Sequence, residues 1–295
     1  MNFQASFSRL PVSEYNPESR RMSSSWIAPL GYEPIRQLSD DGQSQVWQVV
    51  RGQVVSVMRL GPTSTELGLL AALDHPGLLK LQDHGVLPDG RVWYVRAWSE
   101  GREYGQWAAD KPRTVAEVAR VACDVGEALS YLHAQGLLHG DLSPRNILVT
   151  PDGGAQLADY GLTHRMGAPA QGASGTPFHI APEILLQTEV GPASDVFALG
   201  SVLARGWAAD EVDPRAFHAR FPQEDYFQAR GARRAGLPAD VADLVESMLE
   251  RDPRRRLGDA RMVVRAFAER GGTRRTDLTR KDQTRRGLRL ELFRI

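Results

Sequence analysis

The sequence predicts an α+β protein of two lobes, in which a small β-rich lobe precedes a larger helical lobe. Between residues 32 and 98, short apolar runs are separated by turn dipeptides such as Asp41-Gly42 and Asp89-Gly90, a pattern typical of strands joined by tight turns. After Gly101, apolar residues recur at helical spacing instead. This change of period places the boundary between the lobes near residue 100.

In the predicted small lobe, one helical stretch at 65–73 interrupts the strands, and Asp74-His75-Pro76-Gly77 closes it. The predicted strands are 35–38, 46–50, 54–60 and 92–98. In the large lobe, a helix is predicted over 114–135, because its apolar residues share one face and Gly136 follows it. Further helices are predicted over 193–207, 240–250 and 260–269.

The two ends of the chain differ in composition from the lobes. Residues 1–30 are rich in Ser, Pro, Asn and Arg and are predicted to be a flexible leader, although the apolar run 26–30 could dock on a surface. From Arg270 to Ile295 there are nine basic and three acidic residues. The predicted divisions are therefore a leader (1–30), a small lobe (31–100), a large lobe (101–270) and a basic tail (271–295).

Composition excludes several classes of protein. The 295 residues are 42% hydrophobic and 24% charged with a net charge of zero, so no overall field favours nucleic acid or membrane. A single cysteine, Cys123, excludes an internal disulfide framework and is expected to be a buried thiol. No apolar run approaches the ~20 residues of a membrane span, and 1–30 lacks the apolar core of a secretory signal. We expect a soluble, cytoplasmic protein.

The strongest motif is the run 138–148, Leu-His-Gly-Asp-Leu-Ser-Pro-Arg-Asn-Ile-Leu. Four more motifs follow it: Asp159-Tyr160-Gly161, Gly175-Thr176-Pro177 with Ala181-Pro182-Glu183, the run 194–200, and Asp252-Pro253 with three arginines. In this order and spacing they resemble the signature set of protein kinases, over roughly residues 31–270. The style of the sequence is similar to that of bacterial Ser/Thr kinase-like members.

The resemblance implies a role for each matched residue, because phosphoryl transfer needs positioning and neutralised charge. Asp141 would orient the attacking hydroxyl, Arg145 would support the transferred phosphate, and Asn146 and Asp159 would hold magnesium against ATP. The alternative is that these residues only brace the fold. Three further residues would belong to the frame of the large lobe: Asp195, which anchors the catalytic loop, and Glu183 with Arg256, which form an ion pair.

The glycine-rich loop that covers the nucleotide phosphates in this family is altered here. Its three glycine positions are occupied by Ser39, Asp41 and Ser44. Glycines at these positions let backbone N–H groups approach the phosphates without interference from a Cβ atom. Asp41 also adds a negative charge where a polyanion would pass. The cofactor-binding loop is therefore expected to be degraded.

The phosphate-binding lysine of the family is also missing. In the third predicted strand, Met58 stands at the expected lysine position, and no lysine precedes Lys80. A slip of one residue would offer Arg59 instead. Strand alternation argues against this slip, because neighbouring side chains point to opposite faces.

Two charged residues are expected near this position. The family spacing assigns Glu66 as the usual partner of the lysine, and it places Arg96 at the back of the adenine pocket. We expect Arg96 to reach Glu66 or Asp159 and to fill part of the pocket. The alternative is a register slip of one residue that leaves Arg96 on the surface.

Three functions remain in competition. The first is a pseudokinase, with absent or weak phosphotransfer, that acts as a regulatory scaffold or allosteric partner. The second is an atypical active Ser/Thr protein kinase, and the third is a nucleotide-binding sensor that transfers nothing. The resemblance implies ATP and magnesium as cofactors, whereas the altered loop and the missing lysine argue against both. The expected partner is a protein. Nucleic acid is disfavoured because no aromatic residue lies between Arg270 and Arg289 in the tail.

Overall fold

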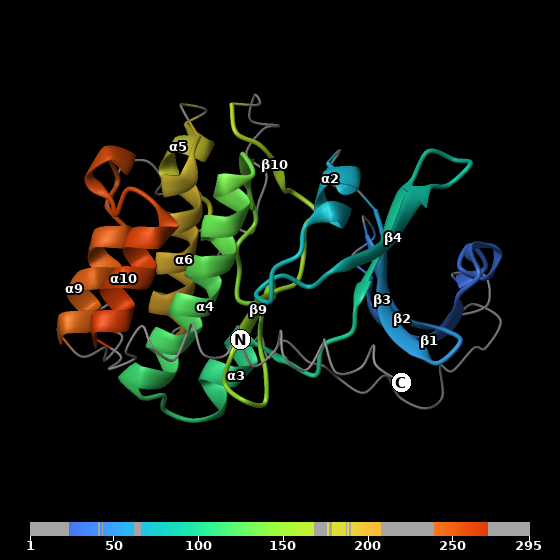
Figure 1. Cartoon of the computed structure of the whole chain (residues 1–295), viewed down its shortest axis with the longest axis horizontal. Coiled ribbons are helices and arrows are strands. Elements are labelled where there is room, and N and C mark those ends of the chain that lie inside the picture. Colours follow the sequence, from blue (N-terminus) through green and yellow to red (C-terminus); the bar gives the residue numbers. More distant parts are fainter. Residues whose placement is uncertain are drawn as a thin grey trace, which may run out of the picture.

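The computed structural model describes residues 24–40, 42, 44–61, 66–167, 176, 179–186, 188, 190–207 and 239–270, and all structural statements below refer to these. Figure 1 shows two lobes, a β-sheet with one short helix beside a larger group of helices. This arrangement confirms the α+β fold predicted from the sequence. In the described part of the chain, no helix is both long and apolar enough to cross a membrane.

The small lobe is built on one antiparallel sheet with the strand order β1-β2-β3-β5-β4. Its strands are β1 (Glu33–Asp40), β2 (Gln45–Arg51), β3 (Val54–Leu60), β4 (Leu81–Val86) and β5 (Val92–Ala97). Four of them confirm predicted strands. The predicted ranges missed β4, because Asp83, His84 and Gly85 interrupt its apolar pattern.

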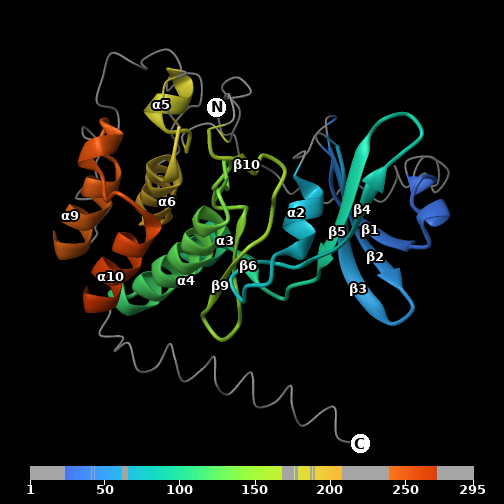
Figure 2. The same cartoon turned by 45° about the horizontal axis from the view of Figure 1, so that its top comes forward.

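The two faces of this sheet are covered by different segments. The helix α2 (Leu67–Ala72) lies on the face toward the large lobe, and the helical turn around Ala28–Leu30 lies on the opposite, outer face (Figure 2). Ile27 is fully buried there against Trp47 and Met58. Of the two possibilities for residues 26–30, a flexible leader or docking on a surface, the structure shows docking.

The large lobe is organised around α4 (Val115–Ala134), whose apolar face is fully buried and packs against α6 (Pro192–Trp207) and α10 (Ala260–Arg270). Thr114 and Glu117 form a capping box at its start, which satisfies otherwise free N–H groups. Cys123 is buried on this helix, and burial raises the pKa of its thiol to about 12. Among the described residues, this lobe also contains the helices α3 (Tyr104–Asp110), α5 (Pro182–Leu185) and α9 (Ala239–Met248).

Two small sheets of the large lobe hold the loop that carries the main motif. One contains β6 (Arg102–Glu103), β8 (Ile147–Val149) and β9 (Ala155–Leu157), and the other pairs β7 (Leu137–Leu138) with β10 (His164–Arg165). Residues 139–146 run from β7 to β8, so both ends of this loop are fixed by strand pairing.

Candidate active site

The loop 139–146 is anchored by the buried carboxylate of Asp195, which lies in the first turn of α6. The backbone N–H groups of His139 and Gly140 donate to its two oxygens at 2.9 and 3.1 Å. His133 Nε2 lies 2.8 Å from Oδ2. Burial raises the pKa of Asp195, but the contacts with His133 and His139 outweigh this and hold the pKa below its usual value. Asp195 therefore carries a negative charge that fixes the loop backbone.

Gly140 follows His139 in a conformation that requires glycine. Its φ is +77°, and an added Cβ would lie 2.6 Å from the carbonyl oxygen of Leu162, because β10 pairs with β7 beside it. We expect Gly140→Ala to lower the free energy of unfolding by about 2–3 kcal/mol, measured by urea denaturation. Gly136→Ala is the matched control, since its φ is +73° but no atom lies within 4 Å of the added Cβ. Equal losses in the two variants would contradict the predicted clash.

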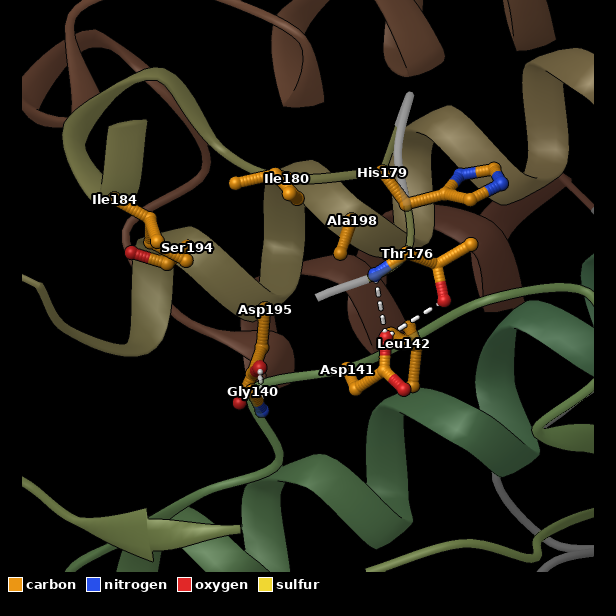
Figure 3. A pocket seen from close by; sticks show the side chains of 10 residues that line it. All are labelled: Gly140, Asp141, Leu142, Thr176, His179, Ile180, Ile184, Ser194, Asp195 and Ala198. Atoms are coloured by element: carbon orange, nitrogen blue, oxygen red, sulfur yellow. Dashed lines mark hydrogen bonds between the residues drawn. The ribbon is translucent and has the colours of Figure 1, made fainter. Parts of the chain in front are cut away.

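The Asp141 carboxylate is fixed by hydrogen bonds on both oxygens, of which Figure 3 shows those from Thr176. Thr176 donates to Oδ1 from its backbone N–H at 2.8 Å and from its hydroxyl at 2.7 Å. Asn146 Nδ2 lies 3.2 Å from Oδ2 and donates to the Asp141 carbonyl at 2.7 Å. A cavity of about 10 Å³ lies beside these groups, which is room for about one water molecule. Oδ1 thus accepts two hydrogen bonds, whereas Oδ2 accepts one and retains an acceptor site for a substrate hydroxyl.

The Asp159 carboxylate is also bonded on both oxygens. Its Oδ2 forms an ion pair with Nη1 of Arg59, from β3. Its Oδ1 accepts from the Tyr94 hydroxyl at 2.8 Å and from the backbone N–H of Gly161 at 2.8 Å. The positively charged side chain of Arg59, from the small lobe, therefore forms an ion pair with Asp159, which was predicted to bind the metal.

The prediction that Met58 occupies the lysine position is wrong. Met58 pairs across the strands with Trp47 and Val95 and is fully buried on the outer face of the sheet. Arg59 pairs with Tyr94, and both reach Asp159 on the cleft face. The actual position differs from the predicted one by a single residue, and an offset of one exchanges the two faces of a strand.

Arg96 lies on the cleft face, as one of the two alternatives predicted, but it does not make the predicted ion pair. It stands opposite Val57 and is mostly buried, and burial lowers the pKa of its guanidinium. Its Nη1 donates to the Ala97 carbonyl at 3.2 Å. Among the described residues, Arg96 forms no ion pair with Asp159 or Glu66, because Arg59 already occupies the Asp159 carboxylate.

Glu66 directly precedes α2 and pairs with the large lobe instead of with Arg59. Its Oε2 lies 3.1 Å from Nε of Arg165, on β10. The Arg165 side chain is 63% exposed, so water screens this ion pair. The carboxylate assigned as the partner of the missing lysine is thus directed toward the segment that follows Asp159.

The turn between β1 and β2 corresponds to the altered glycine loop. Ser39 is exposed, Ser44 is buried, and Asp41 lies outside the described residues. The neighbouring Asp40 closes the turn, since its Oδ1 accepts from the Gly42 backbone N–H at 3.0 Å. This N–H is therefore already bonded within the turn.

Arg145, the second predicted catalytic residue, is exposed and lies near Glu103 at the start of α3. Burial raises the pKa of Glu103, and the charge of Arg145 partly opposes this rise. The sequence reasoning missed Tyr94 and Glu103 as members of the site. Alternation between Tyr94 and Arg96 on one strand was a signal that both share the cleft face.

Of the two predicted metal ligands, Asp159 does not fit a magnesium ion in this conformation. Magnesium takes oxygen ligands, but Oδ2 of Asp159 faces the Arg59 cation and Oδ1 accepts two hydrogen bonds. The bond from Asn146 to the Asp141 carbonyl uses only the amide nitrogen, whereas magnesium would bind the amide oxygen, so it does not count against Asn146. Among the described residues, no group of three or more His, Cys, Asp or Glu side chains has the arrangement of a metal site. Magnesium would require Arg59 to leave.

The two lobes, the loop 139–146 that Asp195 anchors, and the carboxylates of Asp141 and Asp159 are the features of a protein kinase-like protein. A family model for the protein kinase domain matches residues 39–267, so the chain belongs to the protein kinase family.

Curated relatives lie in the same family. The chain is 30% identical over 200 residues to calcium/calmodulin-dependent protein kinase type 1B of Rattus norvegicus, covering 65% of this chain and 58% of that protein. It is 26% identical over 239 residues to a RAC family serine/threonine-protein kinase homolog of Dictyostelium discoideum, covering 77% and 52%. It is 34% identical over 143 residues to serine/threonine-protein kinase PLK4 of Nematostella vectensis, covering 47% and 14%. In each comparison the match spans less than two thirds of the relative's own length.

Proposed function

We propose that this protein is a pseudokinase, in which phosphate transfer is absent or weak, and that it acts on a protein partner as a regulatory scaffold or allosteric element. The observation that carries the proposal is the Asp159 carboxylate, whose oxygens are taken by Arg59, Tyr94 and Gly161. A carboxylate neutralised by an adjacent guanidinium is a poor ligand for a divalent cation. ATP and magnesium are accordingly expected to bind weakly.

Two further features support this proposal. The Gly42 N–H, on the turn where phosphates would approach, already donates to Asp40. On the cleft face, the mostly buried Arg96 places bulk and positive charge at the position assigned to the adenine pocket. Both features reduce the space and the hydrogen-bond donors that a nucleotide would need.

The second candidate is an atypical active Ser/Thr kinase, and the position of Arg59 favours it. Arg59 supplies a cation on the cleft face, at the strand position where the sequence analysis expected Met58. Asp141, Asn146 and Asp159 are all present, and in this candidate they would orient the hydroxyl and hold the metal, with Arg145 supporting the phosphate. Arginine binds phosphate well through its planar fork, so charge alone does not exclude transfer. The third candidate, a nucleotide sensor, requires binding without transfer.

Thermal unfolding with ATP, in the presence of either magnesium or a chelator, separates these candidates. We expect no rise in melting temperature with magnesium and ATP at millimolar concentrations. A functional site at one hundred times its Kd would stabilise the fold by about 2.7 kcal/mol. A rise that requires magnesium and disappears in Asp159→Asn would contradict the proposal in favour of a kinase or a sensor.

Radiolabelled transfer to a generic protein substrate and to the chain itself separates the last two. We expect no more label on the native chain than on Asp141→Asn, which keeps the shape of the side chain but removes its charge. Label that Asp141→Asn abolishes would establish the active kinase. Arg59→Lys is the companion variant, because it places the family's lysine on the residue that faces Asp159. Predicted cytoplasmic location and bacterial character stay predictions from the sequence.

A further inference from the structure

We propose that the N-terminal segment 24–32 controls the β1–β2 turn, through hydrogen bonds that run from Trp26 to Gln45, then to Asp40 and to Gly42. Trp26 and Gln45 would be positioning residues for the turn that faces an incoming anion, such as a nucleotide phosphate. The inference does not require the chain to bind a nucleotide or to transfer phosphate, and its test uses neither.

The first step is that the segment is packed on the small lobe. Ile27 is fully buried and Tyr32 is 4% exposed, both against the outer face of the sheet. Arg51 donates to the Leu30 carbonyl at 2.8 Å and its guanidinium lies 3.7 Å from the centre of the Tyr32 ring. The Tyr32 hydroxyl donates to Asp83 at 3.1 Å. The segment is therefore held at its C-terminal end by contacts remote from the β1–β2 turn.

The second step is the orientation of the Gln45 amide. Its Oε1 accepts from the indole N–H of Trp26 at 3.2 Å and lies 3.4 Å from that of Trp47. An indole N–H only donates, so both rings require the oxygen end of the amide on their side. The Nε2 end then faces Asp40 and donates to its Oδ2 at 3.2 Å. Trp26 thus helps to orient the Gln45 amide so that its nitrogen faces Asp40.

The third step is the effect of Asp40 on the turn. Oδ1 of Asp40 accepts from the Gly42 N–H at 3.0 Å, while Oδ2 accepts from Gln37 and Gln45. Gly42 has a φ of +79°, a conformation that favours glycine. Backbone N–H groups in such turns bind anions when they are free. Here the carboxylate takes that donor, so the turn is closed to an anion while Asp40 is held in place.

These steps join the outer face of the small lobe to the edge of the cleft. Releasing the segment 24–32 removes the Trp26 donor and leaves the Gln45 amide oriented only by the longer contact with Trp47, so Gln45 rotates away from Asp40 more readily. Gln37 still holds Asp40, so the expected effect is partial. A bond of this kind contributes about 0.5–1.5 kcal/mol, which corresponds to a change of about two- to tenfold in the population of the open turn.

Amide hydrogen exchange of Gly42 in the full chain, read by NMR without nucleotide, tests the inference. Trp26→Phe keeps the aromatic ring and removes only the indole N–H. We expect the exchange of Gly42 to become about two- to tenfold faster in this variant. Asp40→Asn is the positive control, since it weakens the acceptor directly and is expected to have at least as large an effect.

Tyr32→Phe is the matched control. It removes one hydrogen bond from the same segment, to Asp83, and is expected to leave Gly42 unchanged. Acceleration in Trp26→Phe and Asp40→Asn alone would support the inference. No change in Trp26→Phe while Asp40→Asn responds would overturn it, as would equal acceleration in Trp26→Phe and Tyr32→Phe. If Asp40→Asn itself has no effect, Asp40 does not close the turn and the inference is also overturned.

Discussion

Arg256→Met is expected to lower the free energy of unfolding by about 3–5 kcal/mol, because it leaves the buried Glu183 carboxylate without its counter-charge. The side chains of the pair are 0% and 3% exposed. Arg256 donates to both Glu183 oxygens, at 2.6 and 2.7 Å, and also to the carbonyls of Ala193 and Arg251 at 3.0 Å. Its guanidinium lies 4.8 Å from the centre of the Phe197 ring.

Urea denaturation followed by circular dichroism measures this loss. Arg254→Met, two residues earlier, is the matched control, because Arg254 pairs with Asp252 at 2.9 Å while its side chain is 88% exposed. Exposed ion pairs contribute about 0–1 kcal/mol, so the control is expected to stay close to the native chain. A similar loss in both variants would show that the burial of the Glu183–Arg256 pair does not govern its contribution.

Met58→Lys is expected to lower the free energy of unfolding by about 4 kcal/mol or more, because it places an ammonium group among apolar side chains. Met58 is fully buried with Trp47, Val49 and Val95. Arg59→Lys, at the next residue, is expected to cost less than about 2 kcal/mol, because the charge stays beside Asp159 and only the hydrogen-bond geometry changes.

Thermal and urea unfolding of these two variants decide which residue faces the cleft. The comparison is informative because the same residue type is introduced at neighbouring positions of one strand. If Met58→Lys were tolerated and Arg59→Lys unfolded the small lobe, the strand register would be the one that the sequence alone suggested. Arg59→Ala adds a second measurement. It removes the cation, so its loss in free energy of unfolding is expected to exceed that of Arg59→Lys.

Much of the fold was predictable from the sequence because local patterns and tertiary packing agree. The helix α4 begins at the Thr114 cap and buries the apolar positions that its spacing indicates. The frame residues were predictable for the same reason, since Asp195 and the Glu183–Arg256 pair belong to motifs with fixed spacing. The family model confirms the resemblance that those motifs carry.

The cleft was less predictable, because its geometry depends on strand register. The run 54–60 is apolar at five of its seven positions, and its two polar residues, Ser56 and Arg59, fall on opposite faces, so alternation alone does not show which face is buried. Only the cross-strand partners, Trp47 for Met58 and Tyr94 for Arg59, decide the faces. Alternation with Arg96 indicates the face of Tyr94, but the pairing of Tyr94 with Arg59 depends on the register between the two strands.

The burial of Cys123 has a practical consequence for measuring motion between the lobes. It is the only cysteine of the chain, and its thiol lies against the Val264 carbonyl at 3.6 Å with a pKa raised to about 12. Because thiol reagents attack the thiolate, the native chain is expected to be nearly inert toward them. Cysteines introduced on the surface of each lobe would then be the reactive positions. Two spectroscopic labels attached there would report the width of the cleft directly, in a background that needs no cysteine removed.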